Sequence, residues 1–234
     1  MSQLTLLDMD NIDFPHVEFA LNEPDGLLAV GGDLSEKRLL NAYFHGILPW
    51  FNEDDPIMWW SPSKRCVIAC NEFHISKSFR KFLRQSSIRV TINKQFDDVI
   101  NYCRQPRKDE PGTWIDDKMT NAYSNLHRQG YAHSVEVWQN DQLIGGLYGI
   151  FINNTFCGES MFSLAPNGSK TALLGLCQFL EHHHVSMIDC QIENPHLLSL
   201  GAKLISRQAF VEHLSYANAL PSTIDWQCQE ITIV

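Results

Sequence analysis

The 234-residue chain is 44% hydrophobic and 19% charged, which excludes an intrinsically disordered protein and provides enough apolar side chains for a large core. Its longest apolar run, residues 143–152, is about half of what spans a bilayer, and acids stand where a signal peptide carries basic residues, so we expect a soluble protein. The seven cysteines have no C-x-x-C spacing, which favours a reducing cytoplasm over a disulfide framework.

Charge is distributed in blocks along the chain. The net charge of −9 taken alone argues against a nucleic-acid partner. Residues 64–108, however, carry 11 of the 18 basic side chains and only three acids. A cluster of like charges in one segment indicates what the protein binds and does not indicate its fold, so this segment is a candidate for binding phosphate groups.

Residues 1–63 predict a small lobe that consists mostly of loops. Turn signals punctuate it, and one short helix is expected over residues 35–45, with Asp33 or Ser35 as its N-cap. Three of the six tryptophans fall between residues 50 and 60, in a segment punctuated by prolines. Such a segment cannot be one regular helix or strand, so the indoles there need another explanation.

Residues 73–85 have the spacing of an amphipathic helix. Apolar side chains occupy one face, and a basic strip occupies another: Lys77, Arg80, Lys81 and Arg84. The strip could be a solvated surface. The surrounding charge block favours the alternative, a strip that binds phosphate groups.

From residue 131 onward the pattern changes to that of a sheet with helices. We expect strands over 133–138, 143–152, 155–163 and 185–191, and helices over 169–182, 195–202 and 207–219. This order predicts an α+β fold, with a GNAT-like mixed sheet and flanking helices over residues 64–234 and the small loop-rich lobe over residues 1–63. A GNAT domain that uses coenzyme A needs a glycine-rich pyrophosphate loop, and residues 165–170 lack it, which argues for another acyl donor.

Two carboxylates lie inside otherwise apolar predicted strands. Glu159 and Asp189 must each find a partner or a cavity, because burying a lone carboxylate is costly. Either alone could be a structural acid, but two in adjacent strands indicate a polar spot in an apolar pocket. The serines lack a G-x-S-x-G context, and the side chains of residues 182–184 point apart on a helix, so neither a hydrolase triad nor a metal site is predicted.

Several motifs resemble those of bacterial leucyl/phenylalanyl-tRNA–protein transferases in order and spacing, from residue 27 to about residue 210. They include GILPWF at 46–51, WWSP at 59–62, GTWI at 112–115, HSVEVW at 133–138, GGLYG at 145–149, GESMF at 158–162 and IDCQ at 188–191. The resemblance implies transfer of Leu, Phe or Met from aminoacyl-tRNA to the N-terminal Arg or Lys of a protein, which marks it for N-end-rule degradation. We expect a cytoplasmic monomer with no cofactor, metal or membrane partner.

The resemblance also implies roles for individual residues. Trp50 and Trp114 would hold the terminal adenosine of tRNA, and the basic strip would bind its acceptor stem. Asp189, held by Gln191, would orient the acceptor amine and help take its proton. Glu159 would recognise a substrate ammonium group, and the two acids could exchange these roles.

The resemblance further implies an apolar pocket for the aminoacyl side chain. The residues expected near it are Leu147, Phe156, Met161, Leu173 and Ile188, with Ser163 at its edge. Each could equally belong to the core. A hydrophobic pocket discriminates one methylene by about 1–3 kcal/mol, so we expect Leu over Val, with Phe and Met tolerated. Trp59 and Trp60 are interpreted as packing between the lobes.

Two other functions remain open from the sequence. One is a FemX-like transferase that uses aminoacyl-tRNA but modifies a peptidoglycan precursor. The other is a non-catalytic RNA-binding module. The chemistry of the acceptor distinguishes the first from a protein-modifying enzyme, and the second predicts that Asp189→Ala changes no activity.

Overall fold

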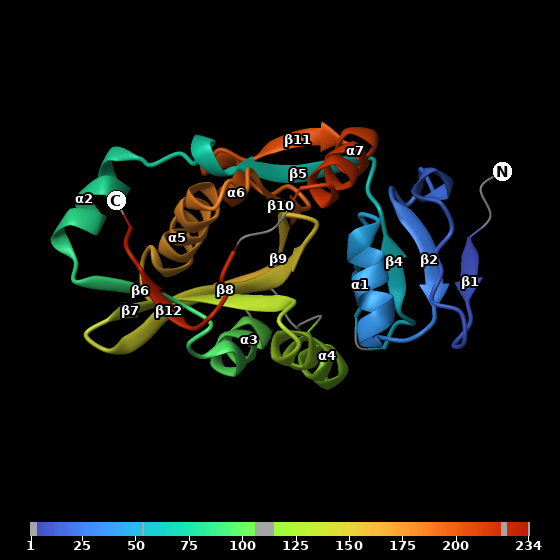
Figure 1. Cartoon of the computed structure of the whole chain (residues 1–234), viewed down its shortest axis with the longest axis horizontal. Coiled ribbons are helices and arrows are strands. Elements are labelled where there is room, and N and C mark those ends of the chain that lie inside the picture. The colour runs from blue at the N-terminus through green and yellow to red at the C-terminus, as the bar shows by residue number, and fades with distance from the viewer. Residues whose placement is uncertain (1–3, 53, 106–114, 221–223, 234) are drawn as a thin grey trace.

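The computed structural model describes residues 4–52, 54–105, 115–220 and 224–233 (Figure 1). Trp114, a predicted site residue, lies outside the described residues. The described residues form a four-stranded sheet in the order β1-β2-β4-β3 and an eight-stranded sheet in the order β11-β5-β10-β9-β8-β7-β6-β12.

The small sheet and one helix form the N-terminal lobe. Its elements are β1 (Thr5–Leu7), a 3-10 turn (Val17–Phe19), β2 (Leu27–Gly31), α1 (Glu36–Phe44), β3 (Leu48–Pro49) and β4 (Met58–Trp60). The predicted helix is confirmed, and the Oγ of Ser35 caps it by accepting from the backbone N–H of Arg38 at 3.4 Å. The lobe is more regular than expected, because its strands are too short to leave a clear alternation in the sequence.

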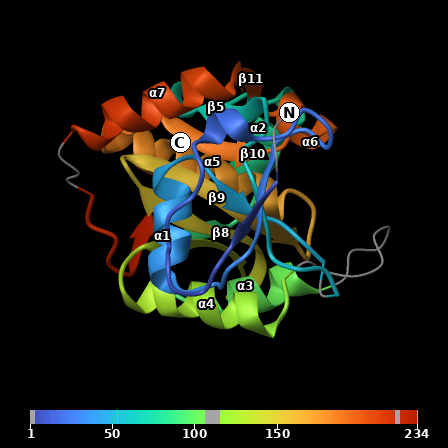
Figure 2. The same cartoon turned by 90° about the vertical axis from the view of Figure 1, so that its right-hand side faces the viewer.

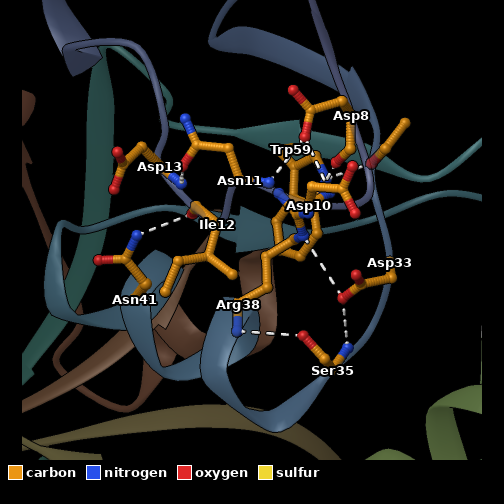
Figure 3. Close-up of polar contacts among 11 residues, drawn as sticks. Asp8, Asp10, Asn11, Ile12, Asp13, Asp33, Ser35, Arg38, Asn41 and Trp59 are labelled. Atoms are coloured by element: carbon orange, nitrogen blue, oxygen red, sulfur yellow. Dashed lines mark hydrogen bonds and ion pairs between the residues drawn. The ribbon is translucent and has the colours of Figure 1, made fainter.

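A buried arginine fastens the N-terminal segment to α1 (Figure 3). Arg38 is fully buried, and its Nη2 donates to the carbonyl of Asp8 at 2.8 Å while its Nε donates to the carboxylate of Asp33 at 3.4 Å. Asn41 donates to the carbonyl of Ile12 at 2.9 Å. Gly32 has a φ of 72°, and a Cβ there would lie 2.9 Å from the guanidinium carbon, so this packing requires glycine.

The large sheet begins immediately after the lobe. Its strands are β5 (Lys64–Ala69), β6 (Ile88–Ile92), β7 (Ala132–Gln139), β8 (Gln142–Ile152), β9 (Thr155–Ser163), β10 (Met187–Gln191), β11 (Lys203–Ser206) and β12 (Gln229–Ile231). Neighbouring strands run antiparallel except β9 and β10, which are parallel. A mixed sheet with flanking helices confirms the predicted α+β fold.

Helices cover both faces of the large sheet (Figure 1). They are α2 (Lys77–Gln85), α3 (Phe96–Arg104), α4 (Asp117–Arg128), α5 (Gly168–His182), α6 (Pro195–Ser199) and α7 (Arg207–Asn218), and a 3-10 turn (Cys70–Glu72) follows β5. The α5 helix packs on one face, and α3 and α4 pack on the other. A Cβ on Gly145 would lie 2.4 Å from the carbonyl carbon of Gly168, so the start of α5 rests directly on the backbone of β8.

One core cluster joins the two lobes. It contains Leu39 and Tyr43 of α1 together with Tyr123 of α4 and Tyr148 of β8. Figure 2, which looks onto the small lobe, shows α1 in front of β8 and β9 with α3 and α4 below. The α1 helix therefore packs directly against the large sheet and α4.

The two adjacent tryptophans of β4 have separate roles. Trp59 is fully buried in its own lobe, where its ring lies 4.9 Å from that of Phe14 and its N–H donates to the carbonyl of Gly31 at 2.9 Å. Trp60 instead lines a depression between the lobes, together with Ile192 and Leu204. Of the two residues expected between the lobes, only Trp60 lies there.

Candidate active site

A cavity lies where the only parallel pair of strands in the described part of the large sheet ends. β9 and β10 pair at two positions, the last being Cys157 with Asp189. Residues 158–161 and 190–192 then line a cavity of about 230 Å³, the main cavity. The pairing of β10 with β5 shifts register between Asp189 and Gln191, and Gln191 has a φ of 64°.

The main cavity is apolar on the side of the sheet and α5. Its lining includes all five apolar residues expected from the sequence: Leu147, Phe156, Met161, Leu173 and Ile188. Leu48, Pro49 and Trp50 of the small lobe complete the lining. The cavity therefore draws on both lobes and suits a hydrophobic group of amino-acid size.

Ser163 lies apart from the main cavity. It is exposed and lines a neighbouring depression with Ser169 and Lys170. Its Oγ accepts from the backbone N–H of Ser169 at 2.8 Å, so it caps the start of α5. Its expected place at the edge of an aminoacyl pocket has no support in this geometry.

Trp50 presents an open indole beside the main cavity. Its side chain is 46% exposed, and its backbone carbonyl accepts from Nε1 of Trp60 at 2.7 Å. The two rings are tilted at 57° with their centres 5.9 Å apart. One indole is thus held by the other while keeping an exposed surface that a flat ring could stack on.

Glu159 lines the main cavity and accepts two hydrogen bonds. Nε2 of Gln191 donates to its Oε1 at 2.7 Å, and the hydroxyl of Tyr123 donates to its Oε2 at 3.0 Å. Burial raises the pKa of Glu159 to about 7, and the hydrogen bonds offset only part of this effect. A carboxyl group with this pKa exchanges protons readily near neutral pH.

The hydroxyl of Tyr43 extends this network into the small lobe. Tyr43 and Tyr123 share a hydrogen bond. Because the hydroxyl of Tyr123 already donates its hydrogen bond to Glu159, Tyr43 is the donor to Tyr123. Burial raises the pKa of both phenols well above the ordinary value, so both stay protonated. The charge state of Glu159 thus depends on a side chain of α1.

Asp189 lies beneath this network in a buried ion pair. Nε and Nη2 of Arg65 donate to its two carboxylate oxygens at 2.8 and 2.7 Å, and both residues are buried. Although burial alone would lower the pKa of Arg65, the charge and hydrogen bonds of Asp189 raise it. Oδ1 of Asp189 also accepts from the backbone N–H of Gln191 at 2.9 Å. Because Arg65 occupies both oxygens, the carboxylate supports Gln191 from below and does not line the main cavity.

Three further residues belong to this site and were not predicted from the sequence. Arg65, Tyr43 and Tyr123 belong to elements far apart in the chain, and no motif links them. A weak signal was present for Arg65, because a charged residue next to the apolar run of residues 66–70 invites a search for a buried acid.

A third hollow, the side depression, adjoins the main cavity at Trp50 and Ile192. It has a volume of about 260 Å³ and is lined by Asp25, Trp50, Trp60, Pro62, Ser63, Lys64, Ile192, Glu193 and Leu204. Asp25 accepts from the backbone N–H and the hydroxyl of Ser63 at 3.1 and 3.0 Å. Two indoles and two carboxylates around one hollow suit a cationic side chain, even though Lys64 offsets part of the charge.

The basic strip lies on the outer surface of α2. All four of its side chains are exposed, and the helix starts later than expected, at Lys77. Ser76 caps it by accepting from the backbone N–H of Phe79 at 3.2 Å, and the ring of Phe79 is buried against the body of the protein. The predicted division into a docked face and a basic face is confirmed.

Comparisons with known proteins identify the family. The family profile described as leucyl/phenylalanyl-tRNA protein transferase matches residues 67–215, and the profile of its N-terminal domain matches residues 32–63. The chain belongs to the leucyl/phenylalanyl-tRNA protein transferase family. It is 52% identical over 233 residues to the transferase of Pseudoalteromonas translucida, covering 99% of this chain and 98% of that one. It is 50% identical to that of Shewanella piezotolerans, covering 100% and 99%.

Membership of this family confirms the aminoacyltransferase class predicted from the motifs. Among solved structures, FemX is similar at 12% identity and a TM-score of 0.44, covering 74% of this chain and 69% of that one. L-PGS from Bacillus licheniformis is similar at 11% identity and a TM-score of 0.38, covering 71% and 53%. Within the described ranges, none of the helices has the length and hydrophobicity needed to span a membrane. All seven cysteines are free.

Proposed function

We propose that the enzyme transfers Leu, Phe or Met from aminoacyl-tRNA to the N-terminal Arg or Lys of an acceptor protein or peptide. The observation that carries the proposal is the main cavity, which is apolar at its floor and bears the Glu159–Gln191 pair at its wall. Such a product enters N-end-rule degradation in the cytoplasm. Because one chain supplies every wall of the cavity, a monomer is sufficient.

The donor would bind in three places. Its apolar side chain enters the main cavity, where shape selects Leu, Phe or Met. Its terminal adenosine stacks on the exposed indole of Trp50, with Trp114 as a proposed second wall, and stacking contributes about 1–3 kcal/mol per base. Its phosphates lie along the basic strip, which supplies four exposed cations.

The acceptor would bind in the side depression. Its N-terminal Arg or Lys side chain lies between the carboxylates of Asp25 and Glu193 and against the indoles of Trp50 and Trp60. Because the side depression shares Trp50 and Ile192 with the main cavity, the acceptor's α-amine points toward the donor ester. Placing both substrates side by side supplies much of the rate by proximity.

Glu159 is proposed as the group that receives the proton of the acceptor amine. An α-ammonium has a pKa of about 7.7–8.0, and that of Glu159 is raised to about 7, so proton transfer between them is nearly balanced. The freed amine attacks the ester carbonyl to form the C–N bond. The C–O bond to ribose then breaks, and the ribose oxygen leaves with the proton that the attacking nitrogen releases.

Asp189 is proposed as a positioning residue, so the two acids exchange the roles first assigned to them. Asp189 holds the backbone N–H of Gln191, and the side chain of Gln191 holds Glu159. These two hydrogen bonds fix the position of the Glu159 carboxylate relative to the main cavity. Arg65 holds both carboxylate oxygens of Asp189 in place.

A transfer assay with a panel of donors and acceptors tests the proposal. The donors are Leu-, Phe-, Met- and Val-tRNA, and the acceptors are peptides that begin with Arg, Lys or Ala. We expect labelling of Arg and Lys peptides from Leu-, Phe- and Met-tRNA, and weak use of Val-tRNA. Labelling of a peptidoglycan precursor but of no peptide would favour the FemX-like alternative, and tRNA binding without any transfer would favour an RNA-binding module.

A further inference from the structure

The C-terminal segment, residues 224–233, folds back onto the large sheet beyond the part matched by the family profile, which ends at residue 215 (Figure 1). Its strand β12 pairs antiparallel with β6 from Gln229–Ile92 to Ile231–Val90. Nδ2 of Asn93 donates to the backbone carbonyl of Trp226 at 2.6 Å. The segment is thus fixed at both ends of a short stretch that contains Trp226.

The indole of Trp226 lies at the centre of an aromatic cluster. It stacks on His133, with the ring centres 4.0 Å apart and the planes 12° from parallel. The rings of Phe151, Phe179 and Phe156 lie 5.1, 5.3 and 5.9 Å from it. Phe156 lines the main cavity and is fully buried, whereas Trp226 is not among the residues that line it. Trp226 therefore lies one ring behind the wall of the main cavity.

Ring contacts, and no hydrogen bond of its own N–H, hold the indole in place. Nε1 of Trp226 is buried and has no hydrogen-bond partner among the described residues, and the same holds for Nε2 of His133. A buried donor without a partner is unfavourable, so among the contacts of the indole itself only those with the neighbouring rings stabilise it. Burial lowers the pKa of His133 to about 3, which keeps its ring neutral beneath the indole.

We propose that Trp226 is a positioning residue that sets the depth of the main cavity by holding the ring of Phe156. The inference rests on the proposed function, because it concerns which amino acid the main cavity admits. The core here is close-packed, so Phe156 cannot retreat while the indole stands behind it. Removing the indole leaves a space into which Phe156 can move, and the main cavity then accepts a longer donor side chain.

The test compares kcat/KM for Phe-tRNA and Leu-tRNA in the wild type and in Trp226→Ala, with Trp226→Leu as a second variant in case the first does not fold. We expect the Phe/Leu ratio to rise about 10-fold, within the range that one methylene gives in a hydrophobic pocket. The KM for an Arg peptide should stay within twofold. Trp226→Phe keeps a ring and loses no hydrogen bond, so its ratio should stay near that of the wild type.

A matched control loosens the same segment away from the main cavity. Ile231 and Ile233 pack beside Gly175 and Val90, and neither is among the residues that line the main cavity. Ile231→Ala with Ile233→Ala should lower the activity with both donors equally. The inference is overturned if Trp226→Ala leaves the ratio unchanged, or if the control pair shifts it as much. Absence of transfer by the wild type from any aminoacyl-tRNA would instead refute the proposed function.

Discussion

Arg65 and Asp189 form a bidentate ion pair across β5 and β10, with N–O distances of 2.8 and 2.7 Å and both residues buried. The same guanidinium donates to the carbonyl of Gly46 at 3.2 Å and lies 4.6 Å from the ring centre of Phe210. Asp189 in turn holds Gln191, which holds Glu159. A single buried charge pair thus supports the polar wall of the main cavity.

Replacing one member of this pair should cost stability and rate together. Asp189→Asn leaves the Arg65 charge buried without its counter-ion, so we expect a loss of about 3–5 kcal/mol in the free energy of unfolding. Urea denaturation measures this loss. Transfer to an Arg peptide should also fall, because Gln191 loses a charged acceptor.

A double variant separates the two effects. Arg65→Met with Asp189→Leu removes both charges, and such replacements are often neutral or stabilising, so most of the lost stability should return. Transfer should stay low, since neither side chain can hold Gln191. Full activity in the double variant would show that Asp189 only maintains the fold.

Glu159 should give the enzyme a pH dependence near neutrality. Its pKa is raised to about 7, so kcat/KM for the acceptor should increase as the pH rises through 7 and the base becomes charged. Glu159→Gln should lower the rate and leave only the limb due to the acceptor amine at about 7.7–8.0. A pH profile with an unchanged inflection near 7 in the variant would assign it to another group.

The same group should destabilise the fold at higher pH. The folded-state pKa lies above the ordinary value of 4.5, so the folded protein favours the protonated form. This contribution is present below pH 4.5 and is lost as the pH rises through 7. Glu159→Gln should therefore gain stability relative to the wild type between pH 5 and pH 8, as measured by urea denaturation at both values.

Glu193 should contribute to acceptor binding and not to donor binding. Glu193→Gln removes one of the two carboxylates of the side depression, and because the residue is exposed the expected rise in KM for an Arg peptide is only about 3–5-fold. The KM for Leu-tRNA should not change. Glu212→Gln, on the exposed side of α7, is the matched control. Equal changes in the KM values for the Arg peptide and for Leu-tRNA would show that the side depression is not the acceptor site.

The basic strip should account for the salt dependence of tRNA binding. Each phosphate contact contributes about 0.7–0.9 to the slope of log affinity against log salt, so Lys77→Gln with Lys81→Gln should reduce the slope by about 1.5. Lys37→Gln with Lys118→Gln removes the same charge from other exposed positions and should leave the slope unchanged. Filter binding between 50 and 200 mM salt checks both, and identical slopes in the two variants would exclude α2 from the interface.

Much of this fold follows from patterns within the chain. The alternation of residues 133–138 and the apolar runs that follow predicted β7, β8 and β9, and the spacing of residues 169–182 predicted α5. The sequence did not predict β1, β3 or β4, because two or three residues cannot show a period of two. The edge strands β11 and β12 are similarly short.

The sequence predicted many of the residues that form the candidate site but not which way the side chain of Asp189 faces. Resemblance to a family identified the five apolar residues that line the main cavity, together with Glu159 and Gln191. Asp189 and Gln191 are two apart, so a regular strand would turn both toward the same side. The register shift between them breaks that rule, and only the three-dimensional structure reveals that Asp189 pairs with Arg65, 124 positions away.

The hydrogen bond between Tyr43 and Tyr123 limits how this enzyme can be recombined. The two residues lie on opposite sides of the border between the lobes, so a chimera that exchanges residues 1–63 with a distant homologue must bring a hydroxyl to the same place. Without it, the phenol oxygen of Tyr123 would lose its hydrogen-bond donor, and the pKa of Glu159 would change even though every residue after position 63 is intact. A chimera of two homologues would need a matching hydroxyl at this tyrosine pair before its transfer activity could be compared with that of either homologue.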